Sequence, residues 1–426
     1  MTDTRFAPPK AASTYSKIRG EVVAGGALGE QDPVAGGPKA VLGLSILAGL
    51  LVVLAFASIW AFVFVVGLLI SIFLHELGHF VTARRSGMKV TQFFLGMGPK
   101  IWSFRRGEVE YGVRALPIGA FVRIIGMNNL DETDPADEPR AYRTKSYPKR
   151  MITITAGSFM HMIIAIVLLF GVYSTWGKNQ ATGRIGVGQV VDGGAAQAAG
   201  VEANDIFVSV DGRAVSNSED VGTIVRSHQV GDALPLVVER DGGEVSLVAT
   251  LRANPDPEIP TPYLGISSGE EHDFVHQSVG SAFVDSFTDL GNAAWQSVGG
   301  VIKVMNPVNI VQHLTGANTD QSTQPVTVYG ISRLSSDIGN ETGLPGILLT
   351  LAGVNVFVGL LNMVPLLPFD GGHAAVATYE RIRSRKGREP YRADVAKMVP
   401  VAMAVMSFLV FVLFAGLYLD ITNPIR

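Results

Sequence analysis

The chain has 426 residues, a net charge of −3, 47% hydrophobic and 17% charged residues, and no cysteine. Soluble domains usually carry about 25% charged residues, so the deficit argues against an ordinary soluble protein and for a membrane protein. The nearly balanced charge, without a basic stripe, argues against nucleic acid as a partner. The lack of cysteine excludes disulfides and thiolate metal sites, so any metal must be bound by His, Asp or Glu.

Residues 1–39 mix Gly, Pro, Ala and charges without periodicity, which predicts a flexible N-terminal tail rather than a secretory signal. A helix needs about 20 apolar residues to cross a bilayer. Long uncharged stretches predict a polytopic α-helical membrane protein with about four transmembrane helices, in residues 40–82, 151–177, 342–373 and 398–419. The first stretch is too long for one simple crossing. Residues 40–57 form either an extra membrane segment or part of one long helix, which leaves the side of the N-terminus open.

The charges of the loops predict the orientation. Residues 83–150 carry 13 Lys and Arg against 7 Asp and Glu, and residues 380–397 carry 7 against 3. Residues 177–342 carry 8 basic against 20 acidic residues. Basic loops stay in the cytoplasm. We therefore expect a multi-pass protein of the plasma membrane, with both basic loops inside and the acidic stretch outside.

His75, Glu76 and His79 form an HExxH motif at the end of the first apolar stretch. On a helix, two histidines four residues apart share one face and can bind one zinc ion. Glu76 lies about 100° round the helix from His75, within reach of a water on the metal, and can act as general base. The alternative is a chance match, but an ionisable residue after a long uncharged stretch is costly and usually functional.

Asp370 is the candidate for the third ligand, because a catalytic zinc usually has three protein ligands and an open position. It follows the third apolar stretch, after two prolines and before two glycines. Prolines break a helix, and irregular backbone at membrane depth is tolerated only in protein or beside a wet cavity. The alternative is an ordinary Asp-Gly turn at a helix end. We favour a Zn²⁺ site of His75, His79 and Asp370 near the cytoplasmic side.

The HExxH motif and the NxxPxxxxDG pattern that starts at Asn362 together resemble the site-2 protease family of intramembrane zinc metalloproteases. The likeness covers most of the chain and is closest to the bacterial, PDZ-containing, actinobacterial type. It implies that His75, His79 and Asp370 bind zinc. It also implies that Glu76 is the catalytic carboxylate and that Asn362 contacts the substrate backbone. The implied substrates are single-pass proteins in the lipid bilayer, such as anti-sigma factors or remnant signal peptides, cut in regulated intramembrane proteolysis.

The second predicted span departs from the pattern of this family, which opens Ala-Gly-Pro-x-x-Asn. Ser158 stands in place of the proline and His161 in place of the asparagine. His161 is a donor behind the metal ligands, a substrate contact or simply a buried histidine, and the sequence leaves these three open. Ala120 stands where the family often has a second glycine, which predicts a stiffer loop with unchanged chemistry.

Two segments outside the spans have predicted folds of their own. Residues 83–150 contain alternating polar and apolar residues and predict a membrane-associated β-hairpin on the cytoplasmic side. By the resemblance it pairs with extended substrate; the alternative is an ordinary hairpin. Residues 180–254 resemble one extracytoplasmic PDZ-like α/β domain, which would take a peptide ligand as an added strand. Residues 255–341 are predicted to be an outer linker with an amphipathic helix, which lies on the membrane or packs on the PDZ-like domain.

The favoured function is therefore an active intramembrane zinc metalloprotease. The alternative is a non-catalytic membrane receptor or scaffold that binds peptides through its PDZ-like domain, and the intact motif residues argue against it. A zinc transporter is a third reading, but transporters generally show internal repeats, and the sequence contains none that we recognise.

Overall fold

The computed structural model describes residues 35–127, 131, 133–256, 261–384 and 390–425. Most of the predicted N-terminal tail, residues 1–34, lies outside the described residues, and residues 38 and 39 already belong to a helix. The chain divides into two compact units, which are described separately. The first combines residues 1–172 and 283–426, and the second is residues 173–282.

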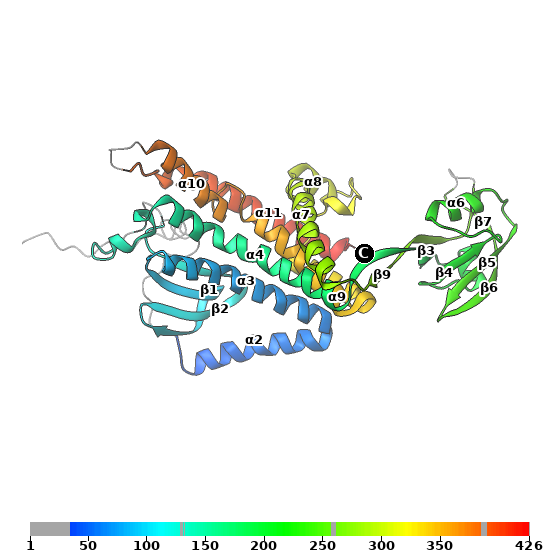
Figure 1. The fold of residues 1–426 in the computed structure, drawn as a ribbon, viewed down its shortest axis with the longest axis horizontal. Coiled ribbons are helices and arrows are strands. Elements are labelled where there is room, and N and C mark those ends of the chain that lie inside the picture. The colour runs from blue at the N-terminus through cyan, green and yellow to red at the C-terminus, as the bar shows by residue number, and fades with distance from the viewer. Residues whose placement is uncertain (1–34, 128–130, 132, 257–260, 385–389, 426) are drawn as a thin grey trace, which may run out of the picture. The chain divides into compact units, whose positions relative to one another are not determined.

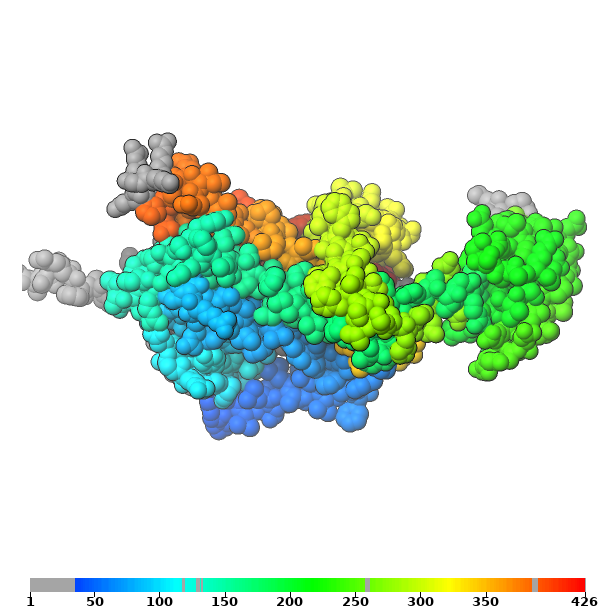
Figure 2. Space-filling view, in the orientation of Figure 1, coloured from blue at the N-terminus to red at the C-terminus, as the bar shows by residue number. Residues whose placement is uncertain are grey.

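Among the described residues, five helices are long and apolar enough to cross a membrane, one more than expected (Figure 1). These are α2 (Pro38–Ala57), α3 (Ile59–Arg85), α4 (Tyr147–Thr175), α9 (Val328–Leu361) and α11 (Val399–Thr422). The additional helix is α2, because the long first stretch divides at Ser58. The backbone of Ser58 is extended, and its hydroxyl accepts the Ala61 N–H to cap α3. Of α2 only Ala40 is buried, and Figure 2 shows α2 at the periphery of its unit.

The third predicted span starts earlier than residue 342. Helix α9 begins at Val328 and bends at Gly343, where φ is 68° and Pro345 follows inside the helix. After α9 the backbone is irregular until α10 (Asp370–Arg383), which begins at the predicted metal ligand. A short 3₁₀ turn, η4 (Val395–Met398), then leads into α11.

Strands β1 (Val90–Arg106) and β2 (Val109–Ile124) form the sheet that follows α3. The two strands pair antiparallel, as in a β-hairpin, with several shifts of register. Residues 92–95 face residues 110–113 on one side and residues 120–123 on the other. Within the described part of the chain, residues 120–123 therefore have a strand neighbour on one side only.

One hydrophobic core joins this sheet to the helices that carry the predicted site. It contains buried side chains from α3, both strands, α4 and α10, among them Ala83, Val90, Val109, Ile154 and Ala377. A second core joins α3 to α9 through Phe64, Ile347 and Leu351. The first core therefore packs the end of α3 that carries the HExxH motif, and the second packs its beginning.

The second compact unit is a five-stranded sheet in the order β6-β5-β4-β3-β9. Its elements are β3 (Lys178–Val190), α5 (Ala195–Ala199), β4 (Ile206–Val210), α6 (Ser218–Arg226), β5 (Ala233–Arg240), β6 (Gly243–Thr250), β7 (Arg252–Ala253), β8 (Pro262–Tyr263) and β9 (Ile266–Val275). The sequence placed the end of this domain at residue 254. The unit reaches residue 282 instead, because β9 pairs with β3 along most of its length.

An ion pair ties β4 to β5 in this unit. The Arg240 guanidinium donates to both oxygens of Asp205, from Nε and Nη2, at 2.7 Å each. Burial raises the pKa of Asp205, but the hydrogen bonds from Arg240 and from the Glu202 N–H outweigh it and hold that pKa below its usual value. At pH values above the pKa that Asp205 has in the unfolded chain, the pair therefore contributes its full stabilisation to the unit. This contribution is lost as the pH falls through the lower pKa that Asp205 has in the folded unit.

The segment predicted as an outer linker contains two helices before α9. These are α7 (Val279–Val304) and α8 (Pro307–Leu314), and short 3₁₀ turns elsewhere are η1 (Glu138–Arg140), η2 (Tyr142–Thr144) and η3 (Gln321–Thr323). The predicted amphipathic helix is α7, and it leaves large apolar side chains exposed, including Phe283, Phe287, Trp295 and Ile302.

Candidate metal centre

His75 and His79 lie one turn apart on α3, with their Nε2 atoms 3.2 Å from each other. Asp370, the first residue of α10, brings its Oδ2 atom to 3.5 Å from Nε2 of His75 and 3.2 Å from Nε2 of His79. Both histidines are buried. Residues almost 300 positions apart in the sequence thus bring three candidate ligand atoms within 4.8 Å of one another.

The three separations suit a zinc ion. Ligand atoms about 2.0–2.1 Å from a tetrahedral zinc lie about 3.3 Å from one another, close to the 3.2, 3.5 and 3.2 Å found among His75, His79 and Asp370. Oδ2 of Asp370 is buried and has no hydrogen-bond partner among the described residues. Two imidazole nitrogens and a carboxylate oxygen are also a usual ligand set for catalytic zinc. The residues therefore fit the metal.

Backbone groups orient the His79 side chain and position the start of the helix that carries Asp370. Nδ1 of His79 donates to the Thr153 carbonyl at 2.7 Å, which leaves Nε2 of His79 free to face the metal. The Gly371 N–H donates to the Asn362 carbonyl at 2.7 Å, so the start of α10 is tied to the end of α9. A Cβ at Gly371 would lie 2.2 Å from the Met363 carbonyl oxygen, so this close turn requires glycine.

Glycines also allow α4 to approach the histidines. A Cβ added to Gly157 would lie 2.3 Å from Nε2 of His79 and 2.4 Å from Cε1 of His75. On the facing helix, a Cβ added to Gly78 would lie 2.8 Å from the Ala156 carbonyl oxygen. Gly157 therefore lies against the two imidazoles, and Ala156 lies against Gly78.

Glu76 lies beside the metal ligands, with Oε1 4.0 Å from Nε2 of His75. Its carboxylate also has a hydrogen-bond contact from the backbone N–H of Val122 in β2. A carboxylate in this position can take a proton from a water held between it and the metal ligands.

A cavity of about 520 Å³ opens next to the three ligands. The cavity is lined by site residues and by the end of β2. The lining includes Glu76, Asn362, Asp370, His373 and residues 120–124. The cavity therefore lies between the candidate catalytic residues and the strand.

The sequence pattern of Peptidase family M50 matches residues 63–410, which is most of the chain. The chain belongs to Peptidase family M50, the site-2 protease family. The zinc metalloprotease Rip1 of Mycobacterium tuberculosis is 32% identical over 396 residues, covering 85% of this chain and 97% of that protein. Rip1 of Mycolicibacterium smegmatis is 30% identical over 400 residues, with the same coverage of 85% and 97%. A putative zinc metalloprotease of Mesorhizobium japonicum is 28% identical over 376 residues, covering 82% and 96%.

These relatives confirm the enzyme class and the cofactor predicted from the sequence: the M50 chain is a membrane zinc metalloprotease. Among solved structures, the PDZ domain of an SdrC-like protein from Listeria monocytogenes is 25% identical. It covers 20% of this chain and 85% of that chain, with a TM-score of 0.18.

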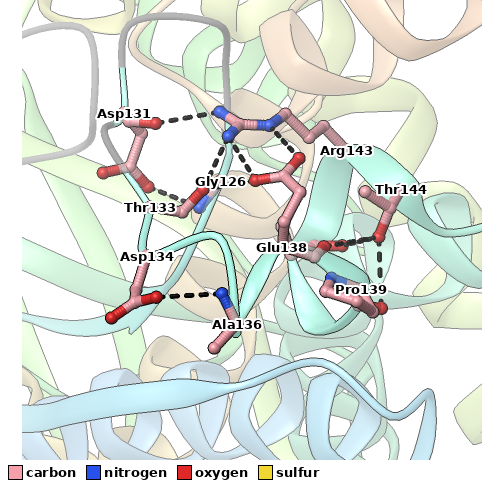
Figure 3. Close-up of polar contacts among 10 residues, drawn as sticks. Gly126, Asp131, Thr133, Asp134, Ala136, Glu138, Pro139, Arg143 and Thr144 are labelled. Atoms are coloured by element: carbon pink, nitrogen blue, oxygen red, sulfur yellow. Dashed lines mark hydrogen bonds and ion pairs between the residues drawn. The ribbon is translucent and has the colours of Figure 1, made fainter.

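In this protease, hydrogen bonds from Arg143 hold the segment between β2 and α4 (Figure 3). Nη1 of Arg143 donates to the Asp131 carbonyl at 2.9 Å, and its Nε and Nη2 donate to the two carboxylate oxygens of Glu138 at 2.8 and 2.6 Å. The hydrogen bonds from Arg143 lower the pKa of Glu138 to about 2. The Asp131 carboxylate accepts the Gly126 N–H at 2.5 Å and also lines the cavity. This network fixes the end of β2, the strand that contains residues 120–123.

His161 is buried, with 2% of its surface exposed, and it does not line the cavity. Its ring centroid lies 4.9 Å from that of His75. Of the three roles that the sequence left open, the position does not suit a substrate contact. It suits a buried residue behind a metal ligand.

Several groups at this site have no signature in the sequence. The Thr153 carbonyl and the Val122 N–H are backbone groups, which no side-chain motif announces. Asn355, which contacts His161, lies inside an apolar run and has no motif of its own. Gly157 carried a signal, because it belongs to the Ala-Gly pair of the family pattern, but the reason for the glycine needed the distance to the imidazoles.

Proposed function

We propose that this protease hydrolyses peptide bonds within the transmembrane segments of single-pass membrane proteins. The main support is where the candidate ligands lie. His75 and His79 are on a helix that is apolar enough to cross a membrane, and Asp370 meets them there. A catalytic group at that depth reaches substrates that are themselves in the bilayer.

In this proposal His75, His79 and Asp370 hold the zinc ion. When bound, the ion supplies a Lewis acid that polarises the scissile carbonyl and acidifies water. Glu76 takes the proton of the attacking water and delivers it to the nitrogen of the leaving amine. The contact from the Val122 N–H keeps the Glu76 carboxylate turned toward the strand side of the cavity.

The substrate must unwind before it can be cut, because a transmembrane helix hides its peptide bonds in its own hydrogen bonds. We propose that the unwound segment pairs with residues 120–123, which line the cavity and have strand pairing on one side only among the described residues. Main-chain pairing of this kind is strand addition and does not depend on substrate sequence. Asn362, on the same cavity, is placed to contact the substrate backbone.

The proposed orientation puts the metal centre near the cytoplasmic side. The loop that follows the HExxH motif carries 13 Lys and Arg, and basic loops stay inside. Ala35, just before α2, exchanges hydrogen bonds of 2.9 Å with Ser103 of β1 in that loop. The start of α2 therefore belongs on the same side as β1, and α2 serves as a fifth span.

We also propose that residues 173–282 act as a PDZ-like domain outside the cytoplasm. Strand β9 is an edge of the five-stranded sheet, and α6 lies beside it, where the Ser218 hydroxyl donates to the Ser268 carbonyl at 3.1 Å. An edge strand next to a helix can take an extended peptide as a further strand. Such a domain would bind the extracytoplasmic part of a substrate before the substrate reaches the metal centre.

The experiment uses the full chain in lipid vesicles with a single-pass reporter protein. Glu76→Gln should keep about one zinc per chain, while cleavage falls by roughly 10²–10⁴-fold, the usual contribution of a general acid–base group. His75→Ala and Asp370→Ala should lose zinc and cleavage together. Elemental analysis and gel-resolved cleavage products measure the two effects.

Glu244→Gln is the matched control, because it makes the same chemical change at an exposed position of the second unit. It should leave zinc content and cleavage unchanged. Cleavage by Glu76→Gln at the wild-type rate would remove Glu76 from the mechanism. Cleavage of soluble peptides but not of the reporter would argue against an intramembrane site.

A further inference from the structure

His161 lies directly behind one of the candidate zinc ligands. It is four residues after Gly157 on α4, so the two residues share the helix face that meets the imidazoles. Its ring is tilted 43° to that of His75, and the centroids are 4.9 Å apart. His161 is 2% exposed. A polar ring buried at membrane depth needs polar partners to offset its desolvation.

A chain of directed hydrogen bonds provides those partners. The Asn355 side chain donates from Nδ2 to the Leu351 carbonyl at 2.8 Å and to the Ser71 hydroxyl at 3.1 Å. Those two donations identify the other amide atom as oxygen, and Oδ1 of Asn355 lies 2.7 Å from Nδ1 of His161. Because Oδ1 only accepts, Nδ1 of His161 carries the proton. In the neutral ring Nε2 then carries the lone pair.

The network returns to the helix from which it starts. The Ser71 hydroxyl donates to the Gly67 carbonyl at 2.9 Å, so Ser71 accepts from Asn355. Ser71 lies on α3 one turn before His75, and both Ser71 and Asn355 are 1% exposed. The path thus runs from α3 through α9 and α4 back to the His75 ring. Three helices are joined at one depth, beside the metal ligands.

The two histidine ligands differ in how they are oriented. A metal-bound histidine usually donates its second ring N–H to a fixed acceptor. Nδ1 of His79 has such an acceptor in the Thr153 carbonyl. The His75 ring makes its hydrogen-bond contact with the backbone of Gly157, but its Nδ1 does not reach full hydrogen-bond geometry with any described residue. The ring of His161 packs against the same imidazole.

We infer that His161 is a positioning residue, held by Asn355 and Ser71, which fixes the His75 ring in its ligating orientation by packing against it. The inference rests on the proposed ligand role of His75. This packing needs the ring of His161, which the asparagine of the family pattern lacks. It also gives Asn355 and Ser71 a shared task in keeping the His161 ring in place.

The test uses the full chain with Co²⁺ in place of zinc, because the visible absorption of cobalt reports the geometry of its ligands. His161→Leu should shift the cobalt bands and lower metal affinity about 10–100-fold, the usual cost of losing a partner of a metal ligand. A competing chelator measures the affinity. His161→Phe keeps a ring against His75 but loses the bond to Asn355, and should fall between wild type and His161→Leu. In variants that keep metal, kcat should fall and KM should stay near the wild-type value.

Ser158→Ala is the matched control, since Ser158 is a buried residue of α4 whose hydroxyl has no hydrogen-bond partner among the described residues. It should leave the cobalt spectrum and the affinity unchanged. If both His161 variants fail to fold, Ser71→Ala carries the test, because it removes only the distal hydroxyl and should still shift the bands slightly. A wild-type spectrum and affinity in every folded variant of His161 or Ser71 would overturn the inference.

The same experiment separates this inference from the proposed function. Cobalt that binds the wild-type chain and is lost in His75→Ala supports the proposed ligand set, whatever His161 does. Cobalt that binds His75→Ala as tightly as wild type would contradict that ligand set, and the inference about His161 would fall with it.

Discussion

Gly157 lies where α4 comes closest to the two imidazoles, and its missing side chain leaves the space that they occupy. The HExxH spacing on α3 places His75 and His79 on one face, but it does not say what packs against them. That packing depends on single atoms: a methyl group at position 157 would lie 2.3 Å from Nε2 of His79. A protein interior cannot absorb such an overlap without moving its neighbours.

Gly157→Ala should therefore displace at least one imidazole and lower zinc affinity about tenfold or more, in the range seen when the surroundings of a metal ligand are disturbed. Chelator competition on the purified protein measures this. Gly171→Ala is the control on the same helix, because a Cβ there would meet nothing within 4 Å. Equal zinc affinity in the two variants would show that the close approach of α4 is not required.

Helix α10 carries Asp370 at its first residue and is held at its other end by a buried ion pair. Nη1 of Arg150, near the start of α4, lies 2.8 Å from Oε2 of Glu380, and the two side chains are 7% and 8% exposed. The Ala393 N–H donates to the other carboxylate oxygen at 2.8 Å. The pair links α10, which carries Asp370, to α4, which packs on His75 and His79.

Glu380→Ala should destabilise the helical unit by about 3–5 kcal/mol, because it leaves the Arg150 charge buried without its partner. Thermal unfolding of the detergent-solubilised chain measures the loss. Glu239→Ala is the control, since it removes one of the two acidic partners of Arg184, from an ion pair whose side chains are 42% and 40% exposed. It should cost about 0–1 kcal/mol. A similar small cost for Glu380→Ala would show that the buried pair does not hold α10.

At the scale of the whole molecule, the arrangement of five candidate spans, two basic loops and one acidic stretch predicts which parts face the cytoplasm. The chain contains no cysteine, so single cysteines can be introduced without a background reaction. Gly36, Ser146 and Ser246 are exposed positions before α2, before α4 and in the second unit, respectively.

With a membrane-impermeant thiol reagent, Ser246→Cys should react in intact cells. Ser146→Cys and Gly36→Cys should react only after the membrane is opened. The unmodified chain serves as the unreactive control. Labelling of Gly36→Cys from outside would show that α2 does not cross the membrane, and labelling of Ser146→Cys from outside would reverse the proposed orientation.

The sequence by itself determined the chemistry. The HExxH spacing, the Asp370 motif and the uncharged stretches predicted a membrane zinc metalloprotease, because metal ligation and membrane burial leave local patterns of residue type and period. Only the tertiary structure decided that residues 40–57 belong to a separate helix and that residues 120–123 line the cavity. It alone also showed that hydrogen bonds join Ser71, Asn355 and His161 next to His75. These features depend on helix packing, strand register and backbone hydrogen bonds between segments far apart in the chain, and no local pattern of side chains records them.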